Sequence, residues 1–196
     1  VVPGDLYAAL PGHVTHGAKF AGGALRLGAV AVLTDRAGLV DLAGVAVPVL
    51  VVDTPRNRLG AVASFVYGDP AGTLQMLAVT GTNGKTTVAA MVESGLRAAG
   101  RVTGMIGTVG VVIDGVAHAG ARTTPEATDL HAVLAVMKEV GVRSVVMEVS
   151  SIALEERRVD GVIYDVAAFT NLSQDHLDYH GTMQAYLSAK LRLFSE

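Results

Sequence analysis

The segment Thr80–Thr87, with the sequence Thr-Gly-Thr-Asn-Gly-Lys-Thr-Thr, contains residue types that bind nucleotide phosphates. Glycines let successive backbone N–H groups converge on phosphate oxygens, and the N-terminus of a following helix adds positive potential. Lys85 can reach the terminal phosphates, and the Thr86 hydroxyl can ligate Mg²⁺. The pattern predicts a phosphate-binding loop, the P-loop, made of Gly81, Thr82, Asn83, Gly84, Lys85, Thr86 and Thr87.

One position departs from the common P-loop pattern, which would place a glycine where this chain has Val79. The context still favours a nucleotide site, because an apolar strand precedes the loop and a helix with an apolar stripe follows it. The alternative is a glycine-rich turn that carries a solvated lysine. The stripe comprises Val88, Met91, Val92 and Leu96.

Two polar features follow later strands. Glu148 lies near the end of an expected buried strand, where an unpartnered carboxylate is costly, so Mg²⁺ or a cation should face it; a structural ion pair is the alternative. After the next strand, residues 175–180 hold two acids and two histidines. Asp178 or His180 can cap a helix, and His176 is favoured as a ligand of a second divalent ion through its neutral imidazole.

Thr124 is expected to cap a helix, with Pro125 at its first position and Glu126 complementing the helix dipole. A capped helix N-terminus also attracts anionic substrate groups, so the two interpretations are compatible. For Arg158, a carboxylate ligand and a place on the surface are both open.

Lys190 lies on the apolar face of the last expected helix, for which Thr182 is the expected N-cap. At about 100° per residue it falls between Tyr186 and Leu191, so its stem is buried or its head meets an anion. One interpretation is that the charged head reaches water along an apolar surface. The other is reaction with CO₂ to give a carbamate, which reverses the charge and can ligate Mg²⁺.

These residues are set in an α/β pattern. The expected helices are 17–28, 55–67, 86–99, 130–140 and 183–194, and the expected strands are 29–33, 47–52, 74–79, 102–106, 142–149 and 165–170. Asp114-Gly115 predicts a hairpin turn. The last two strands are nearly continuous apolar runs, which are typical of strands buried on both faces of a parallel sheet. Ligands bind beyond the carboxyl ends of such strands, where the P-loop and Glu148 are expected.

A cluster of turn formers at residues 68–72 marks the expected domain boundary. Residues 1–70 are predicted to form a small N-terminal α/β domain. Residues 71–196 are predicted to form a mostly parallel-sheet, ATPase-like central domain. Because the chain ends inside a helical pattern, we expect a fragment with an incomplete central domain.

Composition limits the other classes of function. The 196 residues are 51% hydrophobic, which suffices for a packed core. With 15 Lys and Arg against 18 Asp and Glu, the net charge is −3, so neither nucleic acid nor a membrane is an expected partner. No cysteine is present, and no apolar run reaches the roughly 18 residues of a membrane span. We expect a cytoplasmic monomer that acts on small molecules.

Several motifs occur together and resemble the ATP-dependent Mur ligases of peptidoglycan synthesis, most closely the MurE branch of that family. The resemblance spans essentially the whole chain and includes Val79 before the P-loop. The motifs are residues 4–12 (GDLYAALPG), 79–87 (VTGTNGKTT), 123–125 (TTP), 147–151 (MEVSS), 170–180 (TNLSQDHLDYH) and 189–194 (AKLRLF).

The resemblance implies an enzyme that uses ATP to join meso-diaminopimelate or L-lysine to UDP-N-acetylmuramoyl-L-alanyl-D-glutamate through an acyl phosphate. By that likeness the P-loop with Lys85 holds ATP, Thr86 and Glu148 serve one Mg²⁺, and His176 with carbamylated Lys190 serves a second. Residues 1–70 would bind UDP, and an absent third domain would recognise the amino acid. The substrate residues implied are His13, Val14 and Thr15 for UDP, and Thr123, Thr124, Ser150 and Arg158 for the muramoyl dipeptide.

Other functions compete with this one. Folylpolyglutamate synthetase is similar in its P-loop and Mg²⁺ ligands, but the motif at residues 4–12 argues against it. A P-loop kinase or ATP-driven switch would transfer phosphate or change shape without forming an amide. A third alternative is that the fragment is only an inactive nucleotide-binding module. Two positions depart from the family pattern, Arg122 where Asn is common and Ile152 where His is common.

Overall fold

The computed structural model describes residues 1–12, 14–118 and 122–195. Their contacts divide the chain into two compact units, Val1–Leu59 and Gly60–Glu196. The division falls inside helix α2 (Pro55–Val66), before the turn formers at residues 68–72. Both units contain mostly parallel sheets, which confirms the α/β fold class.

The first unit is a three-stranded parallel sheet in the order β1-β2-β3. The helix expected over 17–28 is instead a 3₁₀ turn followed by a short α-helix. The His16 side chain caps the 3₁₀ turn by accepting a hydrogen bond from the Ala18 N–H at 3.0 Å. Gly28, with φ +101°, follows the helix. The elements are β1 (Leu6–Ala8), η1 (Gly17–Phe20), α1 (Ala21–Arg26), β2 (Ala31–Thr34), η2 (Gly38–Leu42) and β3 (Val49–Val51).

The second unit contains a six-stranded sheet in the order β7-β6-β5-β8-β4-β9. Strands β5, β8, β4 and β9 are parallel, and β6 and β7 continue the sheet as antiparallel strands. The hairpin predicted at Asp114-Gly115 is confirmed, with φ +48° and +81° at these residues. The strands are β4 (Gln75–Thr80), β5 (Thr103–Gly107), β6 (Gly110–Ile113), β7 (Val116–His118), β8 (Ser144–Glu148) and β9 (Val166–Phe169). The helical segments after α2 are η3 (Ala71–Thr73), α3 (Lys85–Ala98), α4 (Ala127–Glu139), α5 (Ser151–Glu155), α6 (Leu177–His180), α7 (Met183–Leu191) and η4 (Arg192–Phe194).

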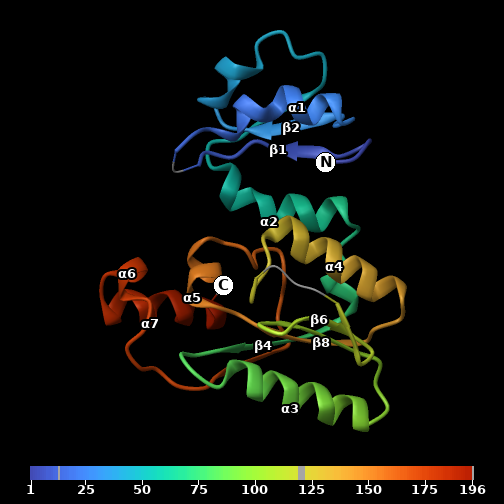
Figure 1. The fold of residues 1–196 in the computed structure, drawn as a ribbon, viewed down its shortest axis with the longest axis vertical. Helices are drawn as coiled ribbons and strands as arrows, with labels where there is room; N and C mark the ends of the chain where they lie inside the picture. The colour runs from blue at the N-terminus through green and yellow to red at the C-terminus, as the bar shows by residue number, and fades with distance from the viewer. Residues whose placement is uncertain (13, 119–121, 196) are drawn as a thin grey trace. The chain divides into compact units, whose positions relative to one another are not determined.

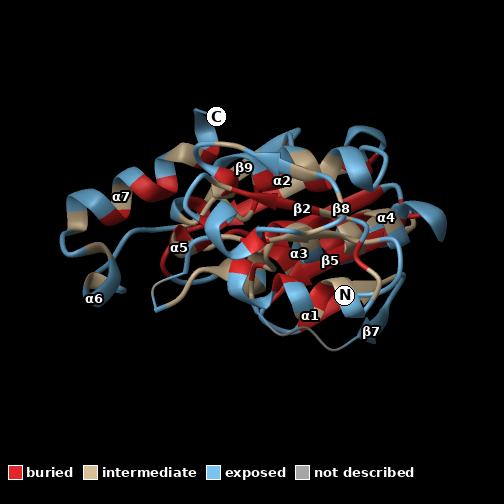
Figure 2. Cartoon of the chain, turned by 90° about the horizontal axis from the view of Figure 1, so that it is seen from above, coloured by how far each residue is buried: buried red, intermediate tan, exposed pale blue. Residues whose placement is uncertain are grey.

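Helices cover both faces of this sheet, with α3 on one side and α4 on the other (Figure 1). Successive residues of a strand point to opposite faces, so Val146 packs with Ala89 of α3 while Met147 packs in the cluster that contains Leu134 of α4. Strands β5 and β8 are buried along their whole length (Figure 2). The fold thus fixes the carboxyl ends of β4, β5 and β8 side by side. Among the described residues, no helix is long and apolar enough to cross a membrane.

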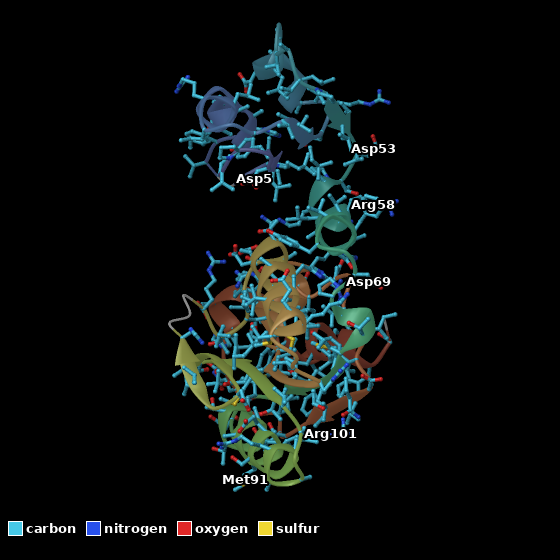
Figure 3. The ribbon with its side chains drawn as sticks, turned by 90° about the vertical axis from the view of Figure 1, so that its right-hand side faces the viewer. Asp5, Asp53, Arg58, Asp69, Met91 and Arg101 are labelled. Atoms are coloured by element: carbon cyan, nitrogen blue, oxygen red, sulfur yellow. The ribbon has the colours of Figure 1, made fainter. Side chains whose placement is uncertain are left out.

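Two predictions of burial are wrong. Strand β9 is the edge strand of the described sheet, and Val166 is 51% exposed, because only β4 pairs with it. Met91, expected in the apolar stripe of α3, is 69% exposed and lies on the outer side of that helix (Figure 3). The inner side of α3 is defined instead by Val88, Ala89, Val92 and Leu96.

His131, a buried histidine of α4, has a hydrogen-bond partner for only one of its two ring nitrogens within the described residues. The Nε2 atom of His131 lies 3.2 Å from the carbonyl oxygen of Asp160, which can only accept, so Nε2 carries the proton. The other ring nitrogen, Nδ1, is buried and has no hydrogen-bond partner among the described residues. Burial lowers the pKa of His131, and the Asp160 hydrogen bond and the charge of Asp69 oppose this only in part.

The neutral state of His131 predicts acid sensitivity. In the unfolded chain this histidine gains a proton near pH 6.5, and in the folded chain only at lower pH. Its stabilising contribution is therefore complete above about pH 6.5 and is lost as the pH falls through the folded pKa. The free energy of unfolding, measured with urea at pH 8, 6 and 5, should fall less on acidification for His131→Leu than for the unchanged chain. Equal losses in the two proteins would contradict this role.

Candidate nucleotide and metal site

The P-loop connects the end of β4 to the start of α3. Gly84, the N-cap of α3, has φ +84°, a left-handed conformation that glycine adopts at little cost. Gly81 has φ +139°, and a Cβ there would lie 1.9 Å from Thr170 Oγ1. The first N–H groups of α3 have no acceptor within the helix and are available to an anion. The backbone therefore has the form that a phosphate site needs.

The segment after β9 holds this loop from a second strand. Thr82 N–H donates to the Asn171 carbonyl at 2.8 Å, and Asn83 N–H donates to the Asn171 side-chain oxygen at 3.1 Å. Ser173 N–H donates to Thr82 Oγ1 at 3.0 Å. Sequence reasoning did not assign Asn171 or Ser173 to the P-loop, because only the parallel pairing of β4 with β9 brings them there.

Two lysines converge on one carbonyl group of the P-loop. Lys85 Nζ and Lys190 Nζ each donate to Gly81 O at 2.9 Å, and Lys85 also donates to Thr82 O at 2.8 Å. Burial lowers the pKa of Lys85, and the charges of Glu148 and Asp175 oppose this. Burial, with the nearby Lys85, lowers the pKa of Lys190 to about 8. Lys190 is 1% exposed, so its head does not reach water as the simpler interpretation expected.

Glu148 is fully buried, and hydroxyl and backbone N–H groups donate to its carboxylate, so the alternative of a structural ion pair is not what holds it. Thr86 Oγ1 donates to Glu148 Oε2 at 2.9 Å. Thr108 donates its N–H to Oε1 at 2.9 Å and its hydroxyl to Oε2 at 3.1 Å. Sequence reasoning missed Thr108, although its place just after β5, beyond the carboxyl end of a parallel strand, was an available signal.

The oxygen atoms of Thr86 and Glu148 are suitable ligands for Mg²⁺. This ion takes hard oxygen ligands in an octahedron at about 2.0–2.1 Å, so neighbouring ligands lie roughly 2.9 Å apart. Thr86 Oγ1 and Glu148 Oε2 have that separation, 2.9 Å. Within the described residues, no group of three or more His, Cys, Asp or Glu side chains could hold a metal ion. A bound Mg²⁺ would thus need phosphate oxygens and water to complete its shell.

His176 lies apart from this group. It is the N-cap of α6 with φ +50°, it is half exposed, and its Nε2 lies 3.6 Å from Asp175 Oδ2. Its ring meets the edge of Tyr186 at a centroid distance of 6.3 Å. Within the described residues, no hydrogen bond or ion pair joins His176 to Lys190. Its role as a ligand of a second metal stays a prediction.

The residues predicted for the muramoyl dipeptide lie together. Thr123 Oγ1 is 3.2 Å from Thr108 Oγ1. Thr124 does not cap α4, which has Glu126 as its N-cap. The Thr124 hydroxyl instead donates to Glu148 O at 2.9 Å and accepts from Ser150 N at 3.1 Å, because Thr124 is buried beside the end of β8. The cap prediction was therefore wrong.

Two further predicted substrate residues border this group. Ser150 caps α5 by accepting from Ala153 N at 3.1 Å. Arg158 forms ion pairs with Glu156 and with Glu126, the latter at 3.1 Å, and Arg122 also pairs with Glu126. Arg158 is thus held by two carboxylates rather than free on the surface.

The residues predicted for UDP belong to the first unit. His13 lies outside the described residues. Val14 is 98% exposed, and Thr15 is half-buried in the turn that precedes η1. Near them, His16 Nε2 pairs with Asp35 Oδ1 at 3.1 Å. The UDP site therefore stays a prediction.

Comparison with known proteins gives the family. Residues 79–196 match the Mur ligase middle domain, and residues 1–67 match the Mur ligase family, catalytic domain. The chain belongs to the Mur ligase family, and its fold and P-loop agree with that membership.

Three individual proteins show how similar this chain is to known members of the family and to a related fold. The UDP-N-acetylmuramoyl-L-alanyl-D-glutamate--2,6-diaminopimelate ligase of Streptomyces avermitilis is 53% identical over 195 residues, which cover 100% of this chain and 38% of that protein. A solved structure of a ligase with the same name has a TM-score of 0.80 and 33% identity, covering 99% of this chain and 39% of that one. A Mycobacterium tuberculosis folylpolyglutamate synthase complexed with ADP and AMPPCP has a TM-score of 0.57 and 19% identity, covering 70% of this chain and 38% of that one. This chain spans about two fifths of the length of the proteins it matches.

The tight packing at Gly107 predicts a sensitive position. A Cβ on Gly107 would lie 2.2 Å from Glu148 Oε1, so Gly107→Ala should displace the carboxylate and lower the free energy of unfolding by about 1–3 kcal/mol. Gly95→Ala on α3 is the matched control, because among the described residues no atom beyond its chain neighbours and its own helix backbone lies within 4 Å of the added Cβ. It should leave stability unchanged or raise it by up to about 1 kcal/mol. Similar urea midpoints for the two variants would argue against the packing described.

Proposed function

We propose that this chain is the nucleotide-binding part of an ATP-dependent ligase that joins meso-diaminopimelate to UDP-N-acetylmuramoyl-L-alanyl-D-glutamate. The names of the similar ligases support diaminopimelate over L-lysine as the amino acid. The observation that carries the proposal is the contact of Thr86 with the buried Glu148 at the base of the P-loop, with Thr123 and Thr124 beside it. This contact supports a nucleotide site with polar groups for a second substrate beside it.

The proposed reaction has two steps. A carboxylate oxygen of the D-glutamate residue bonds to the γ-phosphorus of ATP while the bond to ADP breaks, which gives an acyl phosphate. The amine of the diamino acid then bonds to the acyl carbon, phosphate leaves, and the amine loses a proton. The protein needs no nucleophile of its own, so its contribution is alignment and charge compensation.

The residues of the site have separate roles in this scheme. Lys85, which bonds to loop carbonyls in the structure, would turn to the terminal phosphates and compensate their charge. Thr86 and Glu148 would hold Mg²⁺, which supplies Lewis-acid polarisation of the phosphate oxygens. Thr123, Thr124, Ser150 and Arg158 would position the muramoyl dipeptide. The P-loop amides would orient ATP for in-line transfer.

A second Mg²⁺ site is proposed at Lys190 and His176. The Lys190 amine would bond to the carbon of CO₂ and lose a proton, which leaves a carbamate. A lowered pKa, about 8, gives a larger fraction of the neutral amine that this reaction needs. His176 would add a neutral imidazole.

The remaining parts of the proposal concern the whole protein. Residues 1–70 would bind the UDP group through His13, Val14 and Thr15, and a further domain would bind the amino acid. We propose a cytoplasmic monomer that takes small-molecule substrates and binds neither nucleic acid nor a membrane. The match of residues 1–67 to the Mur ligase family favours this function over a folylpolyglutamate synthase, a kinase or an ATP-driven switch.

Binding measurements on this chain test the proposal. Calorimetric titration with a β,γ-methylene analogue of ATP should show saturable binding that Mg²⁺ strengthens. Titration with UDP-N-acetylmuramoyl-L-alanyl-D-glutamate should also saturate, and UDP alone should bind more weakly because it lacks the dipeptide. Nucleotide binding without any binding of the muramoyl dipeptide would support a different P-loop enzyme.

The charge of Glu148 should matter for Mg²⁺ rather than for folding. Glu148→Gln keeps the shape and can still accept from Thr108 N–H, but it loses the negative charge. The ratio of the affinities for the ATP analogue with and without Mg²⁺ should fall about 10-fold or more. The affinity measured without Mg²⁺ should change little. Glu93→Gln is the matched control, because Glu93 is also buried but bonds to Thr103 and Arg97 instead. Equal effects of the two variants would contradict the metal role.

A further inference from the structure

Helix α7 contacts the P-loop through one tyrosine. Tyr186 is 1% exposed, and its hydroxyl lies 3.1 Å from the hydroxyl of Thr82. Sequence reasoning placed Tyr186 only on the apolar stripe of the last helix. A buried tyrosine hydroxyl normally requires a partner, and here that partner is a residue of the phosphate-binding loop.

The hydrogen-bond inventory fixes the direction of this contact. A threonine hydroxyl has one proton and two lone pairs. The Thr82 hydroxyl donates its proton to the Ser173 carbonyl at 3.1 Å and accepts from Ser173 N–H at 3.0 Å. One lone pair remains, so Tyr186 must be the donor and Thr82 the acceptor. Burial raises the pKa of Tyr186, and the hydrogen bond with Thr82 opposes this only in part, so the phenol keeps a proton to donate.

These bonds saturate the Thr82 side chain. Together with the bond from Thr82 N–H to Asn171 O, they fix both the backbone and the hydroxyl of the second residue of the loop. The neighbouring N–H groups at the start of α3 stay available to an anion. The Thr82 hydroxyl is thus fully occupied by hydrogen bonds to other protein groups. Its role is to hold the loop in place.

The ring of Tyr186 also supports Gly81, the residue before Thr82, by way of Lys190. Lys190 Nζ lies 4.4 Å from the ring centroid, in a cation–π arrangement, and donates to Gly81 O at 2.9 Å. Tyr186 therefore contacts Thr82 directly and Gly81 through Lys190. Two consecutive loop residues depend on one side chain of a helix more than a hundred residues further along the chain.

We propose that Tyr186 is a positioning residue for nucleotide binding, whose hydroxyl holds the P-loop in the conformation that accepts the phosphates of a nucleoside triphosphate. The inference rests on the proposed function of the P-loop and goes beyond it by assigning the support of the loop to α7. A preorganised loop binds phosphate without first losing conformational entropy, so removal of the support should appear as lost affinity.

Tyr186→Phe tests this role because it removes only the hydroxyl and keeps the ring beneath Lys190. Affinity of this chain for the β,γ-methylene analogue of ATP, with Mg²⁺, should fall about 3- to 10-fold. Affinity for UDP-N-acetylmuramoyl-L-alanyl-D-glutamate should not change. Tyr179→Phe is the matched control, since Tyr179 packs in the same group of rings but its hydroxyl faces Glu156 at 3.5 Å.

A double-mutant cycle identifies the path of the effect. In a Thr82→Val background the acceptor is already absent, so Tyr186→Phe should cause no further loss of nucleotide affinity. A full additional loss there would overturn the assignment. So would unchanged nucleotide affinity in Tyr186→Phe, or an equal loss for both ligands with a lowered Tm, which would indicate a general packing role.

The proposed function fails in a distinguishable way. If the unchanged chain, folded by circular dichroism, binds no ATP analogue, the P-loop assignment is overturned and this inference with it. If the unchanged chain binds the analogue and Tyr186→Phe binds it equally well, only the role of Tyr186 is overturned.

Discussion

The burial of the Glu148 carboxylate is the constraint on which the rest of the site depends. A charged group at 0% exposure is tolerated only if every oxygen has a partner, and the partners here come from the P-loop and from the end of β5. Satisfying Glu148 therefore fixes Thr86, Thr108 and the start of α3 relative to β8. Gly107 is required next to it because a larger residue would occupy the volume of the carboxylate.

A second set of contacts holds the P-loop from the C-terminal segment. Asn171 and Ser173 follow β9, and Tyr186 and Lys190 belong to α7, yet all four bond to Gly81, Thr82 or Asn83, or support such a bond. The loop is consequently fixed at carbonyl and side-chain groups and at the N–H groups of Thr82 and Asn83, while the first N–H groups of α3 have no acceptor within the helix. The groups that hold the loop are thus separate from the N–H groups at the start of α3.

The arrangement also concentrates positive charge. Lys85 and Lys190 share the Gly81 carbonyl, and their proximity contributes to the lowered pKa of Lys190. Nearby carboxylates, those of Glu148 and Asp175, act in the opposite direction on Lys85. An incoming polyphosphate would meet the Lys85 ammonium at this end of the loop, where its charge is compensated.

The sequence by itself determined the local features of this protein. A strand, a glycine-rich turn and a following helix identified the P-loop, and the Asp-Gly pair identified the hairpin, because these depend on neighbouring residues. Only the tertiary structure decided the rest. Periodicity could not show that β9 lies at the edge of the described sheet, that Met91 faces outward, or that the Thr124 hydroxyl donates a hydrogen bond to the end of β8 instead of capping α4. The physical reason is that burial and side-chain partners depend on pairings between segments distant in the chain, which no local pattern encodes.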